Sequence, residues 1–354
     1  MTTATGSDSA SSTAVVTVAT RSHFHRARCL LASVQRHLPE ADRFVVLADR
    51  DDDQRLGPQP FEVIPVETLP VPDVAGFVHR YHAAELSFAT KPWALAEMFR
   101  RGYDRAIYLD ADIVVYSSLR PMQDMLDSAT ILLTPHLTET QEGDVLESER
   151  RILQAGAYNA GFIGLSRCPT AERFLSWWQG TLLHDCRVDV ERGYVGDQRW
   201  LDLVPGMFDG VRVVRHPGWN VAHWNMERRP FTTVNGEFRV AGEPLVFFHF
   251  SGLLSGAASP GRQRDPDAIK PLAPAVQALI ADYAKELGRL GANQFSPLPF
   301  AFARSPARFR SESWYRMKSS ARHLLHAAST AAFRRRIQLW LRERTQTRTA
   351  RPMQ

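Results

Sequence analysis

Cysteine is scarce in this sequence, and its spacing excludes two classes of small stabilised fold. The chain of 354 residues has three cysteines, Cys29, Cys168 and Cys186, and no C-x-x-C pair. An odd number without such a pair argues against a disulfide framework and against a zinc ribbon. We therefore expect the three side chains to be small buried hydrophobes in a reducing compartment.

The sequence also lacks long apolar runs and an export signal. No apolar run approaches the roughly 18 residues that a membrane-spanning helix needs. Residues 1–13 are rich in Ser, Thr and Ala, without a basic start or an apolar stretch, so they do not resemble a signal peptide. We interpret residues 1–13 as a disordered leader and predict a cytoplasmic protein.

Charge is abundant but unevenly distributed. There are 43 Lys and Arg against 38 Asp and Glu, for a formal net charge of +5. Residues 300–354 hold 13 of the basic residues and two acids, so this tail carries +11 and the rest of the chain −6. With 44% hydrophobic residues, disorder throughout is excluded. The pattern indicates a mildly acidic globular body with a basic tail.

Short β-branched runs alternate with helical patterns near the start of the chain. Strand-like runs cover residues 14–19, 44–48 and 61–66, and residues 25–37 carry apolar side chains at helical spacing. Strands separated by helices are typical of βαβ units, so we predict an α/β fold with a mainly parallel central sheet. Further predicted elements are helices over 91–101, 170–183 and 198–203, strands over 105–109, 113–116, 129–134, 162–165 and 245–250, and a hairpin joining 231–234 to 237–240.

Asp110 and Asp112 are the acidic pair that apolar strand residues flank on both sides. Carboxylates two residues apart in an extended chain point to one face and suit a divalent cation, and unpaired they would be costly in apolar surroundings. We predict a metal site here, with a structural ion pair to an arginine as the alternative. The acids of residues 49–53 are interpreted as a solvated loop or helix cap, and those of 265–267 as part of a linker.

His249 lies between phenylalanines near the end of a predicted strand, just before Ser251 and Gly252. A histidine in an apolar run is either a satisfied core residue or a ligand, and its place at a strand end favours the ligand. Two aspartates and an imidazole suit Mn²⁺ better than Ca²⁺, with Mg²⁺ as the other option.

Four short motifs follow one another along the chain: Asp110-Ala111-Asp112, Tyr158 to Phe162, Gly196-Asp197-Gln198 and His249-x-x-Gly252. Their order resembles that of retaining GT-A glycosyltransferases of family 8, the glycogenin and bacterial lipopolysaccharide galactosyltransferase group, over roughly two thirds of the chain. The resemblance implies a Rossmann-like nucleotide-diphospho-sugar transferase fold over residues 14–255. It also implies metal-dependent transfer of a hexose from a nucleotide sugar, with UDP as the expected nucleotide, to a saccharide or lipid-linked acceptor in surface polysaccharide synthesis.

The resemblance further implies roles for individual positions. Asp110, Asp112 and His249 would bind the Mn²⁺ or Mg²⁺ ion, and Asp197 and Gln198 would act as the catalytic pair near the anomeric carbon. The donor would contact residues from five segments of the chain, and the residues of the first segment, 18–20, would line the nucleoside. These donor-binding residues are Val18, Ala19, Thr20, Lys91, Asp110, Ala111, Asn159, Ala160, Gly161 and Gly252.

Structural interpretations of the same residues stand beside these roles. Lys91 is alternatively a residue in the first turn of a helix. The Asn159-Ala160-Gly161 step is alternatively a tight turn entering a strand, because Asn and Gly are turn formers. Asp197 is alternatively the N-cap of the helix over 198–203, a role compatible with sugar binding.

Two segments depart from the family pattern or extend it. Family members often continue the last motif to H-x-x-G-x-x-K, but Ser255 stands at the lysine position here, leaving Lys91, Arg262 or Arg264 as replacements at the diphosphate. Residues 219–225 (WNVAHWN) are similar to a segment of bacterial polysaccharide-cluster relatives. Their aromatic side chains either stack on an acceptor sugar or fill a buried corner.

The end of the chain divides into a linker with a helix over residues 256–299 and a basic tail over 300–354. Apolar residues of the tail, including Trp314 and Trp340, recur at helical spacing among arginines. Two basic amphipathic helices of this kind either attach the protein to the anionic inner face of the plasma membrane or pack on the body. No nucleic-acid-binding module is recognised, so we expect no nucleic-acid partner.

Two other functions compete with glycosyl transfer. A sugar-1-phosphate nucleotidyltransferase needs a Gly-rich basic loop after its first strand, and residues 18–26 contain no glycine. A non-catalytic carbohydrate-binding or membrane-scaffolding protein with a degenerate site is the second alternative, and a metal-dependent release of UDP would separate it from the enzyme.

Overall fold

The computed structural model describes residues 11–140, 146–189, 193–253 and 273–302. All of these residues belong to one compact unit, which spans Met1–Ala303. The amphipathic helices predicted for the tail lie outside the described residues, as do Ser255, Arg262, Arg264 and most of the leader.

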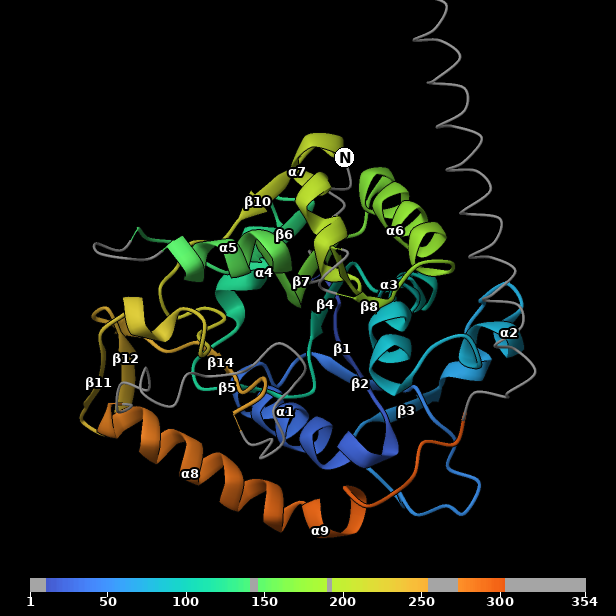
Figure 1. Cartoon of the computed structure of the whole chain (residues 1–354), viewed down its shortest axis with the longest axis horizontal. Helices are drawn as coiled ribbons and strands as arrows, with labels where there is room; N and C mark the ends of the chain where they lie inside the picture. The colour runs from blue at the N-terminus through green and yellow to red at the C-terminus, as the bar shows by residue number, and fades with distance from the viewer. Residues whose placement is uncertain (1–10, 141–145, 190–192, 254–272, 303–354) are drawn as a thin grey trace, which may run out of the picture. The chain divides into compact units, whose positions relative to one another are not determined.

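A seven-stranded sheet with the order β10-β6-β7-β4-β1-β2-β3 forms the centre of this unit (Figure 1). Neighbouring strands are parallel except β7, which runs antiparallel to both β4 and β6. The predicted α/β fold with a mainly parallel sheet is therefore confirmed. The strands are β1 (Thr13–Ala19), β2 (Asp42–Leu47), β3 (Glu62–Pro65), β4 (Arg105–Leu109), β6 (Ile131–Pro135), β7 (Tyr158–Ser166) and β10 (Val211–Val213).

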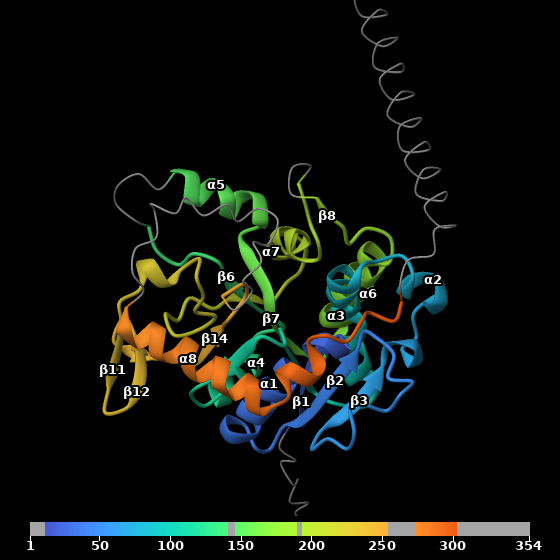
Figure 2. The same ribbon diagram turned by 60° about the horizontal axis from the view of Figure 1, so that its bottom comes forward.

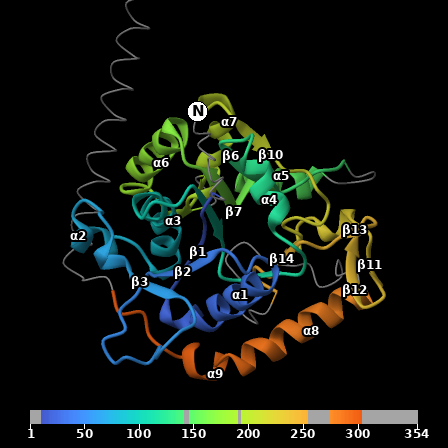
Figure 3. The same ribbon diagram turned by 180° about the vertical axis from the view of Figure 1, so that it is seen from behind.

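Alternate residues of β1 face two different helix layers, as the period of two in a strand requires. Val16 and Val18 belong to the core shared with α3 (Ala83–Arg100) and α6 (Pro169–Leu182). Val15 and Ala19 belong to the core shared with α1 (Phe24–His37) and α4 (Arg120–Leu126). The sheet is therefore covered on both faces, and Figure 3 shows the same helix groups from behind.

A smaller pair of strands brings the end of the body to the acidic motif. β5 (Ile113–Val115) starts directly after Asp112 and pairs antiparallel with β14 (Phe247–His249), so that His249 lies opposite Ile113. The hairpin predicted at Asn235-Gly236 is confirmed, and with a short third strand it forms the sheet β11 (Phe231–Val234), β12 (Glu237–Val240) and β13 (Glu243–Pro244).

The described part of the predicted linker packs on the body. Helices α8 (Pro274–Arg289) and α9 (Ala292–Phe295) lie along α1 (Figures 1 and 2). Tyr283 of α8 stacks on Phe250, and Phe295 of α9 contacts Phe24. The remaining elements are α2 (Val74–Val78), α5 (Leu146–Ala155), α7 (Val204–Met207), β8 (Val188–Asp189), β9 (Tyr194–Val195) and the 3-10 turns η1 (Arg21–His23), η2 (Val66–Thr68), η4 (Gln198–Leu203) and η5 (Met226–Arg228).

One predicted helix boundary is wrong. The helix predicted to start near Lys91 begins at Ala83, so Pro92 lies inside α3 and not in its first turn. The start is marked instead by Glu85, whose carboxylate accepts a hydrogen bond from the backbone N–H of His82 at 3.1 Å. Proline is frequent in first turns, so the pattern around Pro92 predicts a helix start at a place where the helix only continues.

Cys29 and Cys186 are buried, Cys168 is half-buried, and all three are free. Among the described residues, no helix combines the length and the apolar character that crossing a membrane requires.

Candidate active site

Three side chains with metal-binding groups meet where β4 and β14 end. Asp110 and Asp112 occupy the turn between β4 and β5, and His249 is the last residue of β14. The ligand atoms of the three residues all lie within 4.8 Å of one another. His249 Nε2 lies 3.0 Å from Asp112 Oδ1 and 3.7 Å from Asp110 Oδ2. The structure thus brings together the three residues that the sequence assigns to a metal.

His249 and Asp112 each favour the charged form of the other. His249 is only 3% exposed, and burial lowers its pKa, but the carboxylates of Asp112 and Asp110 outweigh burial and raise the pKa above its ordinary value. Burial raises the pKa of Asp112, yet His249 and Arg26 together hold it well below the usual range. Arg26 Nη1 lies 3.7 Å from Asp112 Oδ2, so an arginine is present at this carboxylate beside the histidine.

Lys91 lies in the middle of α3 and is fully buried, so its predicted alternative as a first-turn residue is wrong. Its Nζ lies 3.0 Å from Asp110 Oδ1 and 2.9 Å from Asp197 Oδ2, and it donates a hydrogen bond to the carbonyl of Ala160 at 3.1 Å. Burial lowers the pKa of Lys91, but the two carboxylates outweigh burial and raise it. Lys91 therefore links α3 to the end of β4 and the start of η4 by ion pairs, and to β7 by a hydrogen bond.

Asp197 is the second carboxylate on Lys91 and is 3% exposed. Burial raises its pKa to about 6, because the loss of hydration outweighs the stabilising charge of Lys91. Asp197 occupies the N-cap position of η4, as predicted, but its side chain makes no capping hydrogen bond there. Its carboxylate points to Lys91 instead.

The Asn159-Ala160-Gly161 step lies within β7, so the alternative that it is a tight turn is also wrong. Gln198 Oε1 accepts hydrogen bonds from Asn159 Nδ2 at 2.9 Å and from the N–H of Ala160 at 3.2 Å. Gly161 allows β7 to approach the triad, because a Cβ there would lie 2.5 Å from His249 Cε1. The carbonyl of Gly161 accepts a hydrogen bond from the N–H of Asp110 at 2.8 Å.

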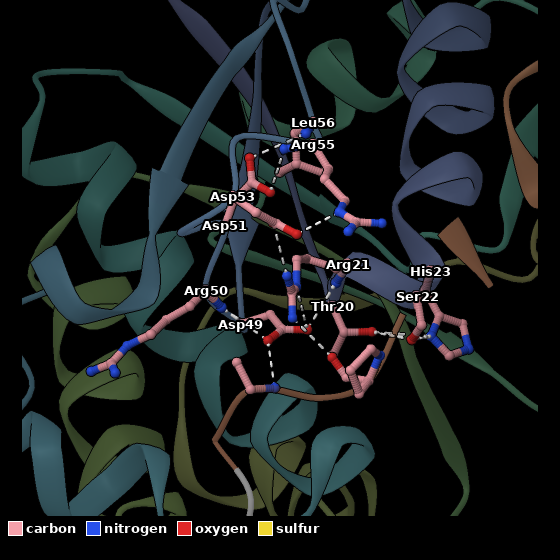
Figure 4. Close-up of polar contacts among 12 residues, drawn as sticks. Thr20, Arg21, Ser22, His23, Asp49, Arg50, Asp51, Asp53, Arg55 and Leu56 are labelled. Carbon is pink, nitrogen blue, oxygen red and sulfur yellow. Dashed lines mark hydrogen bonds and ion pairs between the residues drawn. The ribbon is translucent and has the colours of Figure 1, made fainter. Parts of the chain in front are cut away.

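The predicted nucleoside-binding residues Val18, Ala19 and Thr20 lie at the carboxyl end of β1 and are buried. Figure 4 shows the polar contacts beyond this strand end, where the Thr20 hydroxyl lies 3.1 Å from His23 Nδ1. Ala111 and Gly252 adjoin the triad along the chain, and Gly252 has a φ of +65°.

The interpretation of residues 49–53 as a solvated loop or helix cap is wrong for Asp49, which is 1% exposed. Its carboxylate accepts hydrogen bonds from the backbone N–H groups of Arg21, Arg50 and Ala301, at 3.2, 2.9 and 2.9 Å. Arg21 donates to the carbonyl of Pro299 at 3.0 Å. The ends of β1 and β2 are thus tied to the segment that ends the described chain.

The site contains further residues to which the sequence pattern assigns no role. Tyr108 donates its hydroxyl hydrogen to Asp110 Oδ1 at 2.7 Å. Asn220 contacts both His249 and Asn159, while Trp219 is buried against Phe162 and Phe247. The position of Asn220 between Trp219 and Trp224 is the sequence feature that could have indicated its role. A polar side chain in such apolar surroundings needs hydrogen-bond partners.

No family model matches the chain. Two relatives from Bacillus subtilis (strain 168) are the uncharacterized proteins YfnF and YfnD, which are 26% and 24% identical to it over 247 and 243 residues. The first alignment covers 68% of this chain and 81% of YfnF, and the second covers 67% of this chain and 76% of YfnD.

The solved structures that match include the galactosyltransferase LgtC in complex with donor and acceptor sugar analogs, at 17% identity and a TM-score of 0.43, over 81% of this chain and 97% of that one. The glycosyltransferase GlyE of Streptococcus pneumoniae TIGR4 matches at 13% identity and a TM-score of 0.44, over 79% of this chain and 63% of GlyE. Mouse xyloside xylosyltransferase 1 matches at 15% identity and a TM-score of 0.38, over 69% of this chain and 98% of that one. All three of these proteins are named as glycosyltransferases.

Proposed function

We propose that the chain is a metal-dependent retaining glycosyltransferase, which moves a hexose from a nucleotide sugar to a saccharide or lipid-linked acceptor. One observation carries the proposal: a triad of metal-binding groups is joined by buried side chains to Asp197 and Gln198. Lys91 links Asp110 to Asp197, and Asn159 donates to Gln198. The donor that suits such a site has a diphosphate at the triad and a sugar beside these two residues.

The residues of the triad fit a divalent cation. Two carboxylates and one imidazole offer oxygen and nitrogen ligands within 4.8 Å of one another, a set that suits Mn²⁺ and, less well, Mg²⁺. Asp110, Asp112 and His249 would hold the ion, which when bound supplies positive charge against the negative charge that develops on the leaving diphosphate. UDP as the nucleotide is part of the proposal through the family resemblance.

The other residues of the site position groups around the donor sugar. Lys91 keeps the carboxylates of Asp110 and Asp197 in fixed places, because its three acceptors leave the ammonium no other orientation. Gln198 is held through its Nε2, which donates to the carbonyl of Ala155 at 2.9 Å. An oxocarbenium-like sugar is stabilised by a nearby carboxylate or amide oxygen, and Asp197 and Gln198 offer both. Positioning of the acceptor hydroxyl then supplies much of the acceleration.

A donor panel tests the proposal. The full chain is incubated with Mn²⁺ and a set of nucleotide sugars, and release of the nucleoside diphosphate is measured with and without added saccharides. We expect slow hydrolysis of one donor and faster release with a suitable acceptor. Absence of both binding and release across the panel would refute the proposal. Binding without release would favour the non-catalytic alternative. Release of pyrophosphate in a separate incubation with a nucleoside triphosphate and a sugar-1-phosphate would favour the nucleotidyltransferase.

A double variant assigns the activity to the triad. Asp110→Asn with Asp112→Asn removes both carboxylates with little change in volume, so we expect at least a thousandfold loss of release with the fold retained by circular dichroism. Asp52→Asn is the matched control, because Asp52 is exposed. Full turnover in the double variant would dismiss the metal assignment.

A further inference from the structure

The amide of Asn220 lies between the histidine of the triad and the asparagine of the proposed sugar site. Asn220 is 1% exposed and has a φ of +49°, a conformation that asparagine adopts more readily than most residues. Its Oδ1 lies 3.3 Å from His249 Nδ1, and its Nδ2 lies 2.9 Å from Asn159 Oδ1 and 2.8 Å from the Thr134 hydroxyl. The residue belongs to segment 219–225, to which the proposed function assigns no role.

Backbone groups fix the direction of each hydrogen bond in this chain of side chains. The N–H of Gly161 is a donor and lies 3.0 Å from Asn159 Oδ1, so the atom at that place is an oxygen. The Asn220 atom that faces this oxygen must then be a donor, Nδ2. The other end of the Asn220 amide, Oδ1, is an acceptor and faces His249. His249 Nδ1 must therefore carry the hydrogen.

The far end of the network gives the same orientation of Asn159. His136 Nδ1 lies 2.8 Å from the carbonyl of Gly156, so Nδ1 donates and Nε2 is left as an acceptor. Asn159 Nδ2 lies 3.3 Å from this Nε2 and 2.9 Å from Gln198 Oε1. Two independent backbone groups, one at each end, therefore agree on how Asn159 is turned.

The main chain holds Asn220 in place from the other side. Asn225 Nδ2 donates to the carbonyl of Asn220 at 3.0 Å, and the N–H of His249 donates to the carbonyl of Val221 at 2.8 Å. Segment 219–225 is thus tied directly to β14, the strand that carries the metal ligand. These contacts hold Asn220 and His249 in a fixed arrangement relative to each other.

We propose that Asn220 is a positioning residue that holds His249 in the tautomer with hydrogen on Nδ1, and so presents the Nε2 lone pair to a divalent cation between Asp110 and Asp112. The same amide holds Asn159 Oδ1, so the metal ligand and the sugar-site asparagine are placed by one side chain. The inference rests on the metal site of the proposed function and not on glycosyl transfer itself. Partners of this kind on metal-bound histidines typically change metal affinity 10-fold to 100-fold when removed, on the order of the effect expected here.

Two substitutions separate the acceptor of Asn220 from its donor. Asn220→Leu removes both, and we expect Mn²⁺ affinity to fall about 10-fold to 100-fold. Asn220→Asp keeps an acceptor for His249 Nδ1 but no donor for Asn159. We expect the Mn²⁺ affinity of Asn220→Asp to stay within about threefold of the wild-type value. Its affinity for a nucleotide sugar should fall. Binding is measured on the full chain with Mn²⁺ alone, from the electron paramagnetic resonance signal of free Mn²⁺.

Ser33→Ala is the control, because it removes a buried polar group near the same strands without touching Asn220 or His249. The Ser33 hydroxyl donates to the carbonyl of Leu30 at 2.6 Å and accepts from the N–H of Val115 on β5 at 3.0 Å. We expect this variant to lose stability in thermal unfolding but to keep its Mn²⁺ affinity. Equal losses of Mn²⁺ affinity in Ser33→Ala and Asn220→Leu would show a purely structural role and overturn the proposal, as would wild-type affinity in Asn220→Leu.

A spectroscopic measurement on the unaltered sequence stands even where a variant fails to fold. Histidine labelled with ¹⁵N reports its tautomer through the couplings of the two ring nitrogens, and a His249→Gln spectrum identifies the resonance. In the Mg²⁺-loaded protein we expect hydrogen on Nδ1 of His249, and hydrogen on Nε2 would overturn the proposal. Normal Mn²⁺ binding with no release from any donor would instead refute the proposed function and leave this inference intact.

Discussion

Lys91 offers the sharpest test of how the site is held together. Replacement by methionine keeps a side chain of similar length and removes the charge. The change leaves Asp110 Oδ1 and Asp197 Oδ2 without the ammonium that lies 3.0 and 2.9 Å away. Breaking a buried ion pair by removing one partner typically costs about 3 to 5 kcal/mol, because the other charge stays buried and uncompensated. We expect Lys91→Met to lower the free energy of unfolding by that amount at pH 8.

The pH dependence of this loss follows from Asp197. Its pKa in the folded protein is about 6, above the ordinary value of 3.8, so the folded state binds the proton more tightly than the unfolded chain. The contribution of Asp197 to stability is therefore most favourable at low pH and declines as the pH rises from about 4 to about 6. This difference in pKa corresponds to roughly 3 kcal/mol. Without Lys91 the pKa rises further, and the decline extends above pH 6.

Urea unfolding followed by tryptophan fluorescence measures both effects. Metal-free wild type and Lys91→Met are compared at pH 5, 6, 7 and 8, and we expect the stability difference to grow with pH. Lys285→Met is the control, because this lysine is exposed on α8 and its replacement should change stability by less than about 0.5 kcal/mol. A difference between Lys91→Met and wild type that is constant over this pH range would refute the assignment of the buried charge to Asp197.

Three further predictions concern the triad and the tail. Gly161→Ala places a methyl group 2.5 Å from His249 Cε1, so Mn²⁺ titration should show weaker binding, whereas Gly180→Ala, which meets nothing within 4 Å, should leave it unchanged. Arg26→Gln removes the guanidinium near Asp112, so the KM for a nucleotide sugar should rise severalfold, while Arg36→Gln at the far end of α1 should not change it. Truncation after residue 303 should weaken sedimentation with anionic vesicles and spare donor hydrolysis. Truncation before Phe300 should also destabilise the body, because Ala301 contacts Asp49 and Phe302 is fully buried.

The sequence predicts those parts of the site that local pattern encodes. Asp110 and Asp112 are recognisable because apolar strand residues flank them, and His249 because it ends an apolar run. A carboxylate pair in such surroundings requires a partner, so the local pattern predicts the acidic half of the triad, while His249 is brought to it from β14. The alternation of strands and helices likewise predicts the mainly parallel sheet, because a helix between two strands lets the second strand run in the same direction as the first.

Contacts between distant segments were not predictable in the same way. Lys91 pairs with Asp110 and Asp197, but nothing local distinguishes it from a solvated helix residue. Asp49 resembles its exposed neighbours in an acidic loop, yet a segment some 250 positions later supplies one of its donors. Asn220 lies in a segment with two tryptophans, so the segment resembles an aromatic packing segment and not a polar site. In each case the partner is chosen by tertiary packing, which periodicity and propensity do not encode.

The charges of the assembled site lead to an order of binding. Lys91 lies against Asp110 and Asp197, whereas His249 and Arg26 lie against Asp112. With His249 neutral, as a metal ligand must be, the three carboxylates and the two cationic side chains carry a net charge of −1. A diphosphate approaching such a cluster is repelled, whereas a divalent cation cancels the charge and creates a site for the anion. We therefore expect the cation to bind first and calorimetric titration with a nucleotide sugar to give no measurable heat in the presence of a chelator. Donor binding of equal affinity with and without Mn²⁺ would mean that Arg26 and the backbone suffice for the diphosphate, and that the triad serves structure alone.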